Sequence, residues 1–227
     1  MDLLGETFDP IHNGHLGLAG ETMQLFILQK VLFLPVSRSP HKLHYRPTSS
    51  EHRVAMLELA LARETAFSTE LLEVEKSGVS YTIETLSRLK ERHPEWELFL
   101  ILGADAFMVM DTWKSYADIF KLCHVLVGTR PDTKLELPAK LRQTLGLKKT
   151  PFEKNNDPLL ITLNPANGKT LRLYQIPPQA ISSSEIRHRV QAKKEIKNLL
   201  PPAVRSEEHT SELQSRTNLV CRLLLEK

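Results

Sequence analysis

The sequence predicts an α/β protein with a doubly wound, mostly parallel sheet in a single domain. Short apolar runs alternate along the chain with longer segments of helical periodicity, a pattern typical of parallel strands joined by helices. The 227 residues are enough for one such domain with a sizeable core. Hydrophobic residues make up 41% of the chain and charged residues 25%, as in ordinary globular proteins.

The N-terminal elements follow from apolar runs and the turn residues between them. A short first strand is expected over 1–4 and a helix over 13–29. The continuous apolar run at 31–36 predicts a buried strand. A loop rich in Pro and Ser follows it over 35–47.

The rest of the chain continues the alternation. A helix is expected over 50–63, where Val54, Leu57 and Leu61 share one face at spacings of i, i+3 and i+7. Further strands are expected over 67–74, 97–102, 125–128 and 171–176. Further helices are expected over 82–92, 116–122 and 183–192. The polar stretch 134–168 predicts mainly loop, and the whole order suits a Rossmann-like sheet.

Charge and cysteine content limit the partners that the chain is expected to have. The formal net charge of +3 suits an anionic small molecule but is too weak to indicate nucleic acid. Cys123 and Cys221 show neither CxxC nor metal-ligand spacing, so we expect no disulfide framework, no metal site and a reducing cytoplasm. No signal peptide or membrane span is expected, and no pattern indicates an oligomeric state.

The strongest motif is the segment GETFDPIHNGH at 5–15, between the first strand and the first helix. Such a turn presents free backbone N–H groups and the positive end of the helix dipole, which suits phosphate. Gly5 allows close approach of a ligand, while His12 and His15 project from one face of the first helical turn. Two imidazoles there can stabilise charge on a leaving pyrophosphate. An isolated HxGH is also compatible with two surface histidines, but the preceding TFDP turn favours phosphate binding.

A second candidate phosphate site is the segment ISSSEIR at 181–187. Serines at a helix start favour N-capping, here by Ser182 or Ser183. Arg187, one turn into the helix, can donate two parallel hydrogen bonds from its planar guanidinium to phosphate oxygens. Alone the segment is a common capping box. Together with HxGH it predicts two helix starts that converge on one triphosphate.

Two segments suggest contacts with a second substrate. The loop SRSPHK at 37–42 offers Lys42 to neutralise a phosphate, unless it is only a solvated basic loop. The segment SYTIETL at 80–86 places Thr82 at a helix start, where it either caps the helix or binds a ligand.

A further segment follows a predicted strand. LILGADAF at 100–107 places Gly103 and Asp105 at the carboxyl end of that strand, where α/β proteins bind ligands. Asp105 can accept hydrogen bonds from ribose hydroxyls. The indole of Trp113 suits stacking on an electron-poor ring, with a core tryptophan as the alternative.

These segments resemble the motifs of bacterial nicotinate-nucleotide adenylyltransferases, within the nucleotidyltransferase superfamily marked by HxGH. The family patterns are GGTFDPIHxGH, SxxPHK, SYTIxTL, GADAF with a following Trp, and ISSTxIR. The resemblance covers about residues 2–204. Glu6 stands where the family usually has a second Gly, and Ser184 where it has Thr.

The resemblance implies transfer of the adenylyl group of ATP, with Mg²⁺ on its phosphates, to nicotinate mononucleotide. The products are the deamido form of NAD and pyrophosphate, in NAD biosynthesis. By resemblance, the catalytic residues are His12, His15 and Arg187. The residues implied at ATP are Gly5, Thr7, Phe8, His12, His15, Gly103, Asp105, Ile181, Ser183 and Arg187. Those implied at the mononucleotide are Lys42, Thr82 and Trp113.

Three alternatives stay open at this point. Nicotinamide mononucleotide is a rival substrate. A phosphopantetheine adenylyltransferase shares HxGH, but that family is shorter and lacks the SYTIxTL and GADAF–Trp combination. A catalytically impaired nucleotide-binding protein is the third, because of Glu6, although intact His12, His15 and Arg187 argue against it.

The C-terminal segment differs from the rest of the chain. Residues 205–215, RSEEHTSELQS, resemble residue for residue the in-frame translation of a widely used sequencing adapter. We therefore expect a nucleotidyltransferase domain over 1–204 and a non-native tail over 205–227 that contributes nothing to the site.

Overall fold

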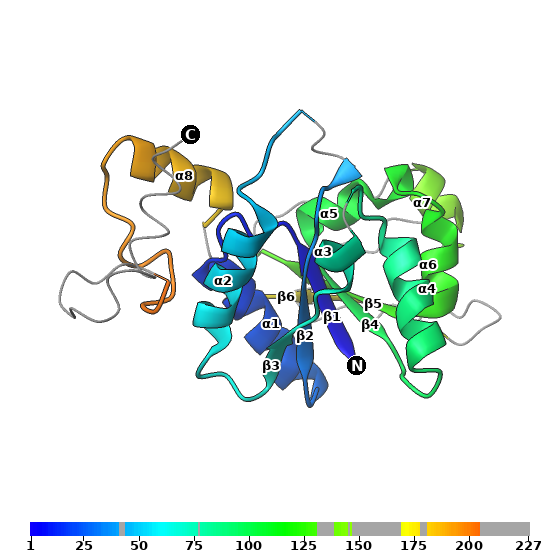
Figure 1. Ribbon diagram of the computed structural model, residues 1–227. Coiled ribbons are helices and arrows are strands. Elements are labelled where there is room, and N and C mark those ends of the chain that lie inside the picture. The colour runs from blue at the N-terminus through cyan, green and yellow to red at the C-terminus, as the bar shows by residue number, and fades with distance from the viewer. Residues whose placement is uncertain are drawn as a thin grey trace. The chain divides into compact units, whose positions relative to one another are not determined.

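The computed structural model describes residues 1–40, 44–76, 78–130, 139–144, 146, 169–177 and 181–204 (Figure 1). Lys42, most of the stretch 134–168 and the segment 205–227 lie outside these residues, and so do the expectations made for them.

Within the described residues, six strands form one sheet, as the sequence predicts. They are β1 (Asp2–Glu6), β2 (Val31–Pro35), β3 (Phe67–Thr69), β4 (Phe99–Gly103), β5 (His124–Thr129) and β6 (Leu171–Gln175). Their order is β3-β2-β1-β4-β5-β6. Strands β2 and β3 therefore lie on one side of β1, and β4, β5 and β6 lie on its other side. The pairs β1–β4, β4–β5 and β5–β6 are parallel. This order confirms the predicted α/β, Rossmann-like, doubly wound fold.

The helices lie mainly between the strands. They are α1 (Asn13–Phe26), α2 (Ser50–Leu61), α3 (Leu72–Lys76), α4 (Thr82–Arg92), α5 (Ala104–Met108), the 3₁₀ helix η2 (Met110–Thr112), α6 (Tyr116–Leu122), α7 (Ala139–Thr144) and α8 (Ser183–Gln191). Within the described ranges, none of these helices has the length and apolar character that crossing a membrane requires.

The chain divides into two compact units. The first unit comprises the described residues within Met1–Gly5, Leu18–Val31 and Ser80–Pro178. The second unit comprises the described residues within Glu6–Gly17, Leu32–Val79 and Gln179–Lys227. The helix α1 contributes to both, because its first turn belongs to the second unit and its remainder to the first.

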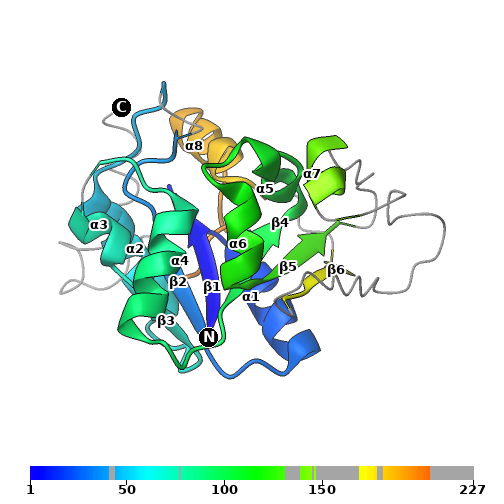
Figure 2. The ribbon, with the colours of Figure 1, turned by 90° about the vertical axis from the view of Figure 1, so that its right-hand side faces the viewer.

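In the first unit, helices cover the strands β4, β5 and β6. Figure 2 shows α4 and α6 side by side on the near face of the strands of this unit, with α1 on the far face. Helix α1 comes so close that a Cβ on Gly128 of β5 would lie 2.5 Å from a methyl carbon of Leu18. Thr22 of α1 also hydrogen-bonds the buried hydroxyl of Tyr174 in β6. A side chain at Gly128 would therefore push α1 away from the sheet.

In the second unit, aromatic side chains form part of the core around β2. The ring of Phe33 lies 5.7 Å from that of Phe8 and 5.3 Å from that of Phe67. Helix α2 begins after Ser49, whose hydroxyl accepts the backbone N–H of His52. Its buried residues are Arg53, Met56, Leu57, Ala60 and Leu61, whereas the predicted Val54 is only half-buried. The buried face of α2 therefore includes Arg53 in place of its neighbour Val54, which the sequence predicted.

Three segments differ from the sequence prediction. The prediction of a strand over 67–74 is wrong beyond Thr69. The side-chain carboxylate of Glu70 accepts the backbone N–H of Leu72 at 3.2 Å, and α3 starts at Leu72. Helix α1 ends at Phe26, because Ile27 takes a left-handed conformation with φ of 53°. The stretch predicted as loop contains the short helix α7.

Candidate active site

The loop between β1 and α1 is held by a buried aromatic side chain. Phe8 takes a left-handed conformation with φ of 48°, which costs about 1–2 kcal/mol for a residue with a Cβ. Its ring is 1% exposed and contacts Phe33 and the edge of His15, with 5.0 Å between the Phe8 and His15 ring centres. Core packing thus holds the strained backbone and one of the two histidines together.

The two histidines of HxGH form a stacked pair. Their ring centres are 3.6 Å apart and their planes differ by 16°. The backbone N–H of His12 donates to Nδ1 of His15 at 3.2 Å. Because Nδ1 accepts this bond, the proton of a neutral His15 sits on Nε2. His15 therefore offers an Nε2–H donor, which is the group that a phosphate oxygen needs.

The first turn of α1 is less open to an anion than the sequence suggests. We predicted free backbone N–H groups here, but those of His12, Asn13 and His15 already donate within the protein. Asn13 donates its backbone N–H to the carbonyl of Leu199 at 2.9 Å and its side-chain amide to that of Asn198 at 3.0 Å. Much of the capacity to hold an anion at this turn therefore rests on the imidazole side chains.

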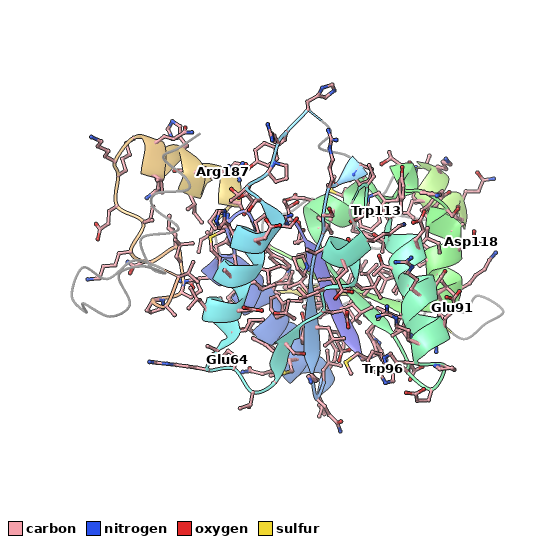
Figure 3. All side chains as sticks on the ribbon, viewed as in Figure 1. Glu64, Glu91, Trp96, Trp113, Asp118 and Arg187 are labelled. Carbon is pink, nitrogen blue, oxygen red and sulfur yellow. The ribbon has the colours of Figure 1, made fainter. Side chains whose placement is uncertain are left out.

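The start of α8 is joined directly to the same loop. Ser182 is the N-cap and accepts the backbone N–H of Glu185 at 3.2 Å. Ser183 donates its hydroxyl to the carbonyl of Pro10 at 3.0 Å. Arg187, marked in Figure 3, donates from Nη1 to the carbonyl of Asp9. The second unit therefore brings residues 6–15 and the segment 181–187 together, as predicted. Ile181 is half-buried just before the cap.

A buried carboxylate, Asp9, lies at the centre of this arrangement and was absent from the predicted site residues. The residue is 2% exposed. Its Oδ2 accepts the hydroxyl of Tyr45 and the backbone N–H of Thr48, the latter at 3.1 Å. The segment that follows β2 is thereby attached to the loop between β1 and α1.

Arg53 is a second residue that the sequence analysis missed. It is fully buried and donates to the carbonyls of Thr7, Val36, Ser37 and Thr48 at 2.7–3.2 Å and to the hydroxyl of Ser50 at 3.0 Å. Burial lowers the pKa of its guanidinium, an effect that the nearby Asp9 opposes. The sequence signal for it is a charged residue one turn before Leu57, on the apolar face of a predicted helix.

The first unit holds the remaining predicted residues. Gly103 is the N-cap of α5 at the end of β4, and Asp105 is exposed in the first turn of that helix. Thr82 is the first residue of α4 and does not cap it, because Tyr81 occupies the N-cap position.

Trp113 lies near the start of α4. Figure 3 shows Trp113 and Trp96 toward opposite ends of that helix. Lys114, next to Trp113, forms an ion pair of 2.7 Å with Glu84, and its ammonium lies 4.5 Å from the centre of the Tyr81 ring. The hydrogen bond to Glu84 raises the pKa of Lys114. The residues predicted from SYTIETL and from the Trp113 region are thus neighbours.

The predicted ATP residues divide between the units. Gly5, Gly103 and Asp105 belong to the first unit, whereas the remaining ones belong to the second, namely Thr7, Phe8, His12, His15, Ile181, Ser183 and Arg187. Within the parts of the chain that the structure describes, no group of three or more His, Cys, Asp or Glu side chains is arranged to hold a metal ion.

Comparisons with known proteins agree with these motifs. The model of the cytidylyltransferase-like family matches residues 3–189. A protein of Moorella thermoacetica named "Probable nicotinate-nucleotide adenylyltransferase" is 37% identical over 206 residues, covering 90% of this chain and 86% of that protein. A protein of the same name from a Geobacter species is 38% identical over 204 residues, covering 90% and 93%.

A solved structure shows the same fold. The nicotinic acid mononucleotide adenylyltransferase of Plasmodium falciparum, complexed with NaAD, superposes with a TM-score of 0.66 at 16% identity, covering 97% of this chain and 94% of that one. With the matched family model and the relatives of similar length, these findings establish the family. The chain belongs to the nicotinate-nucleotide adenylyltransferase family, within the wider group of cytidylyltransferase-like proteins.

Proposed function

We propose that this chain transfers the adenylyl group of ATP to nicotinate mononucleotide, forming nicotinate adenine dinucleotide and pyrophosphate. The observation that carries the proposal is the joining of two phosphate-binding segments in one unit, with the stacked His12–His15 pair on one side and Arg187 on the other. The names of the relatives at 37% and 38% identity support the same reaction.

The proposed reaction is an in-line displacement at the α-phosphorus of ATP. The 5′-phosphate of the mononucleotide attacks and pyrophosphate leaves, so one P–O bond forms as another breaks. The attacking phosphate is already ionised at neutral pH, and no general base is needed. Catalysis then consists of positioning and charge stabilisation. Nε2–H of His15, the imidazole of His12 and the guanidinium of Arg187 are the donors that stabilise the leaving pyrophosphate.

The other site residues have binding roles in this proposal. Gly103 and Asp105 hold the sugar of ATP, while Thr82, Trp113 and Lys42 hold the pyridine nucleotide. The backbone of the loop around Thr7 and Phe8, with Gly5 before it and Ile181 and Ser183 on the other segment, surrounds the phosphates.

Magnesium fits this site as an ion that arrives with ATP. Mg²⁺ keeps several waters and binds readily through substrate phosphates, and the basic side chains His12, His15 and Arg187 suit the phosphates rather than the ion. When bound, it neutralises part of the triphosphate charge. With two cysteines and no CxxC spacing, the chain suits a reducing compartment, so we propose that the reaction takes place in the cytoplasm.

The test is pyrophosphate release by the full chain, with ATP and either mononucleotide. We expect a higher kcat/KM for nicotinate mononucleotide than for nicotinamide mononucleotide. The reverse preference would establish the amide enzyme, and ATP binding without release would indicate a nucleotide-binding protein. We also propose that residues 1–204 form the catalytic part, so that the chain ending at Val204 should retain the activity of the full chain in this assay.

Replacing Glu6 with glycine should strengthen ATP binding about fivefold, because a carboxylate near the triphosphate repels it. Glu6 is the last residue of β1, half-buried, at the start of the loop that leads to His12. Calorimetric titration of ATP into the parent and Glu6→Gly measures the effect. Glu64→Gly, an exposed glutamate of the same unit (Figure 3), is the matched control. Equal or weaker binding by Glu6→Gly would mean that its side chain points away from the phosphates.

A further inference from the structure

Tyr45 links the two parts of the candidate phosphate site, although it lies outside the sequence motifs, in the predicted loop over 35–47. Its hydroxyl donates to the carboxylate of Asp9. The guanidinium carbon of Arg187 lies 4.7 Å from the centre of its ring. One side chain therefore contacts both the loop before α1 and the arginine of α8.

The hydroxyl acts on the residue that holds Arg187. Asp9 is buried, and its backbone carbonyl accepts a hydrogen bond from Arg187 while its Oδ2 accepts from Tyr45. Burial and the contact with Asp9 raise the pKa of Tyr45, so the phenol stays protonated and remains a donor to Asp9 at neutral pH. Loss of this bond would leave a buried carboxylate with fewer donors and free the loop to shift.

The ring acts on Arg187 directly. Nη1 of Arg187 donates to Asp9 and Nη2 donates to the hydroxyl of Ser184 at 3.2 Å, so the guanidinium is held at its edge. The aromatic face of Tyr45 supports its plane, as in other cation–π contacts. These contacts at the edge and the face restrict the orientation of the guanidinium. Preorganised charge binds an anion better than a mobile side chain does.

We propose that Tyr45 is a positioning residue that orients Arg187 for the phosphates of ATP, through its ring and through the Tyr45–Asp9 hydrogen bond. The inference rests on the proposed function, since that function supplies the phosphate. It assigns Tyr45 no contact with the reacting atoms.

The test separates the two contacts by substitution. Tyr45→Phe keeps the ring and removes the hydroxyl, and we expect the Kd for ATP to rise about fivefold, the usual effect of one lost hydrogen bond. Tyr45→Leu removes both contacts, and we expect a rise of about 25-fold. The readouts are ATP and inorganic pyrophosphate titrations of the full chain, with kcat and KM measured in parallel. Tyr116→Phe, which removes a hydroxyl bonded to Thr144 at 2.7 Å, should leave every value unchanged.

A double-mutant cycle distinguishes positioning from general stability. If Tyr45 acts through Arg187, Tyr45→Leu should weaken ATP binding less than about threefold in an Arg187→Ala background. The same loss in both backgrounds, or parent-like binding by Tyr45→Leu alone, would overturn the inference. A parent that binds ATP but releases no pyrophosphate would overturn the proposed function while leaving the Tyr45 measurements valid. A parent that binds neither ATP nor pyrophosphate would overturn both.

Discussion

Replacing His12 or His15 with alanine should lower turnover by about two orders of magnitude or more, comparable to the loss of one oxyanion-hole donor. Each variant removes an imidazole from the stacked pair. His15→Ala also leaves the backbone N–H of His12 without the Nδ1 acceptor that it has now. We therefore expect His15→Ala to affect the loop as well as the chemistry.

The measurement is initial-rate pyrophosphate release, with circular dichroism to show that the fold survives. His188→Ala is the matched control, since His188 is an exposed histidine of α8. Its turnover should equal that of the parent. If both His12→Ala and His15→Ala keep turnover within about threefold of the parent, these histidines do not have the assigned role.

Arg53→Met should lower the free energy of unfolding by about 3–5 kcal/mol, a large part of the roughly 5–15 kcal/mol of a typical domain. Methionine fills much of the same volume but donates no hydrogen bond. Four carbonyls and the Ser50 hydroxyl would then lose the hydrogen bond that Arg53 donates. Arg53→Lys keeps the charge with three donors instead of five, and we expect a smaller loss.

Urea unfolding of the full chain measures both variants. Arg63→Met makes the same change at an exposed position just beyond the end of α2, and it should change stability by less than about 0.5 kcal/mol. If Arg53→Met unfolds at the same urea concentration as Arg63→Met, the hydrogen bonds of Arg53 contribute nothing net to stability.

Regular periodicity made several elements predictable from the sequence. The predicted helices over 82–92 and 116–122 agree with α4 and α6 at both ends. The buried strands β2 and β5 were likewise located to within one residue at each end, because continuous apolar runs between helices favour parallel strands. The pattern was weak over 67–74. There the backbone N–H of Leu72 donates to the side chain of Glu70, and α3 begins in place of the rest of the predicted strand.

The sequence by itself determined the family, the fold class and the two candidate phosphate-binding segments, because these depend on residues that are close together in the chain. Only the tertiary structure showed the contacts of Asp9, Tyr45 and Arg53. Their partners are brought close by folding: Tyr45 is 36 positions from Asp9, and Arg53 is 46 from Thr7. Several of the acceptors are backbone carbonyls, which any residue can supply. A contact of that kind leaves no pattern in the side chains along the sequence, so the fold alone decides where it forms.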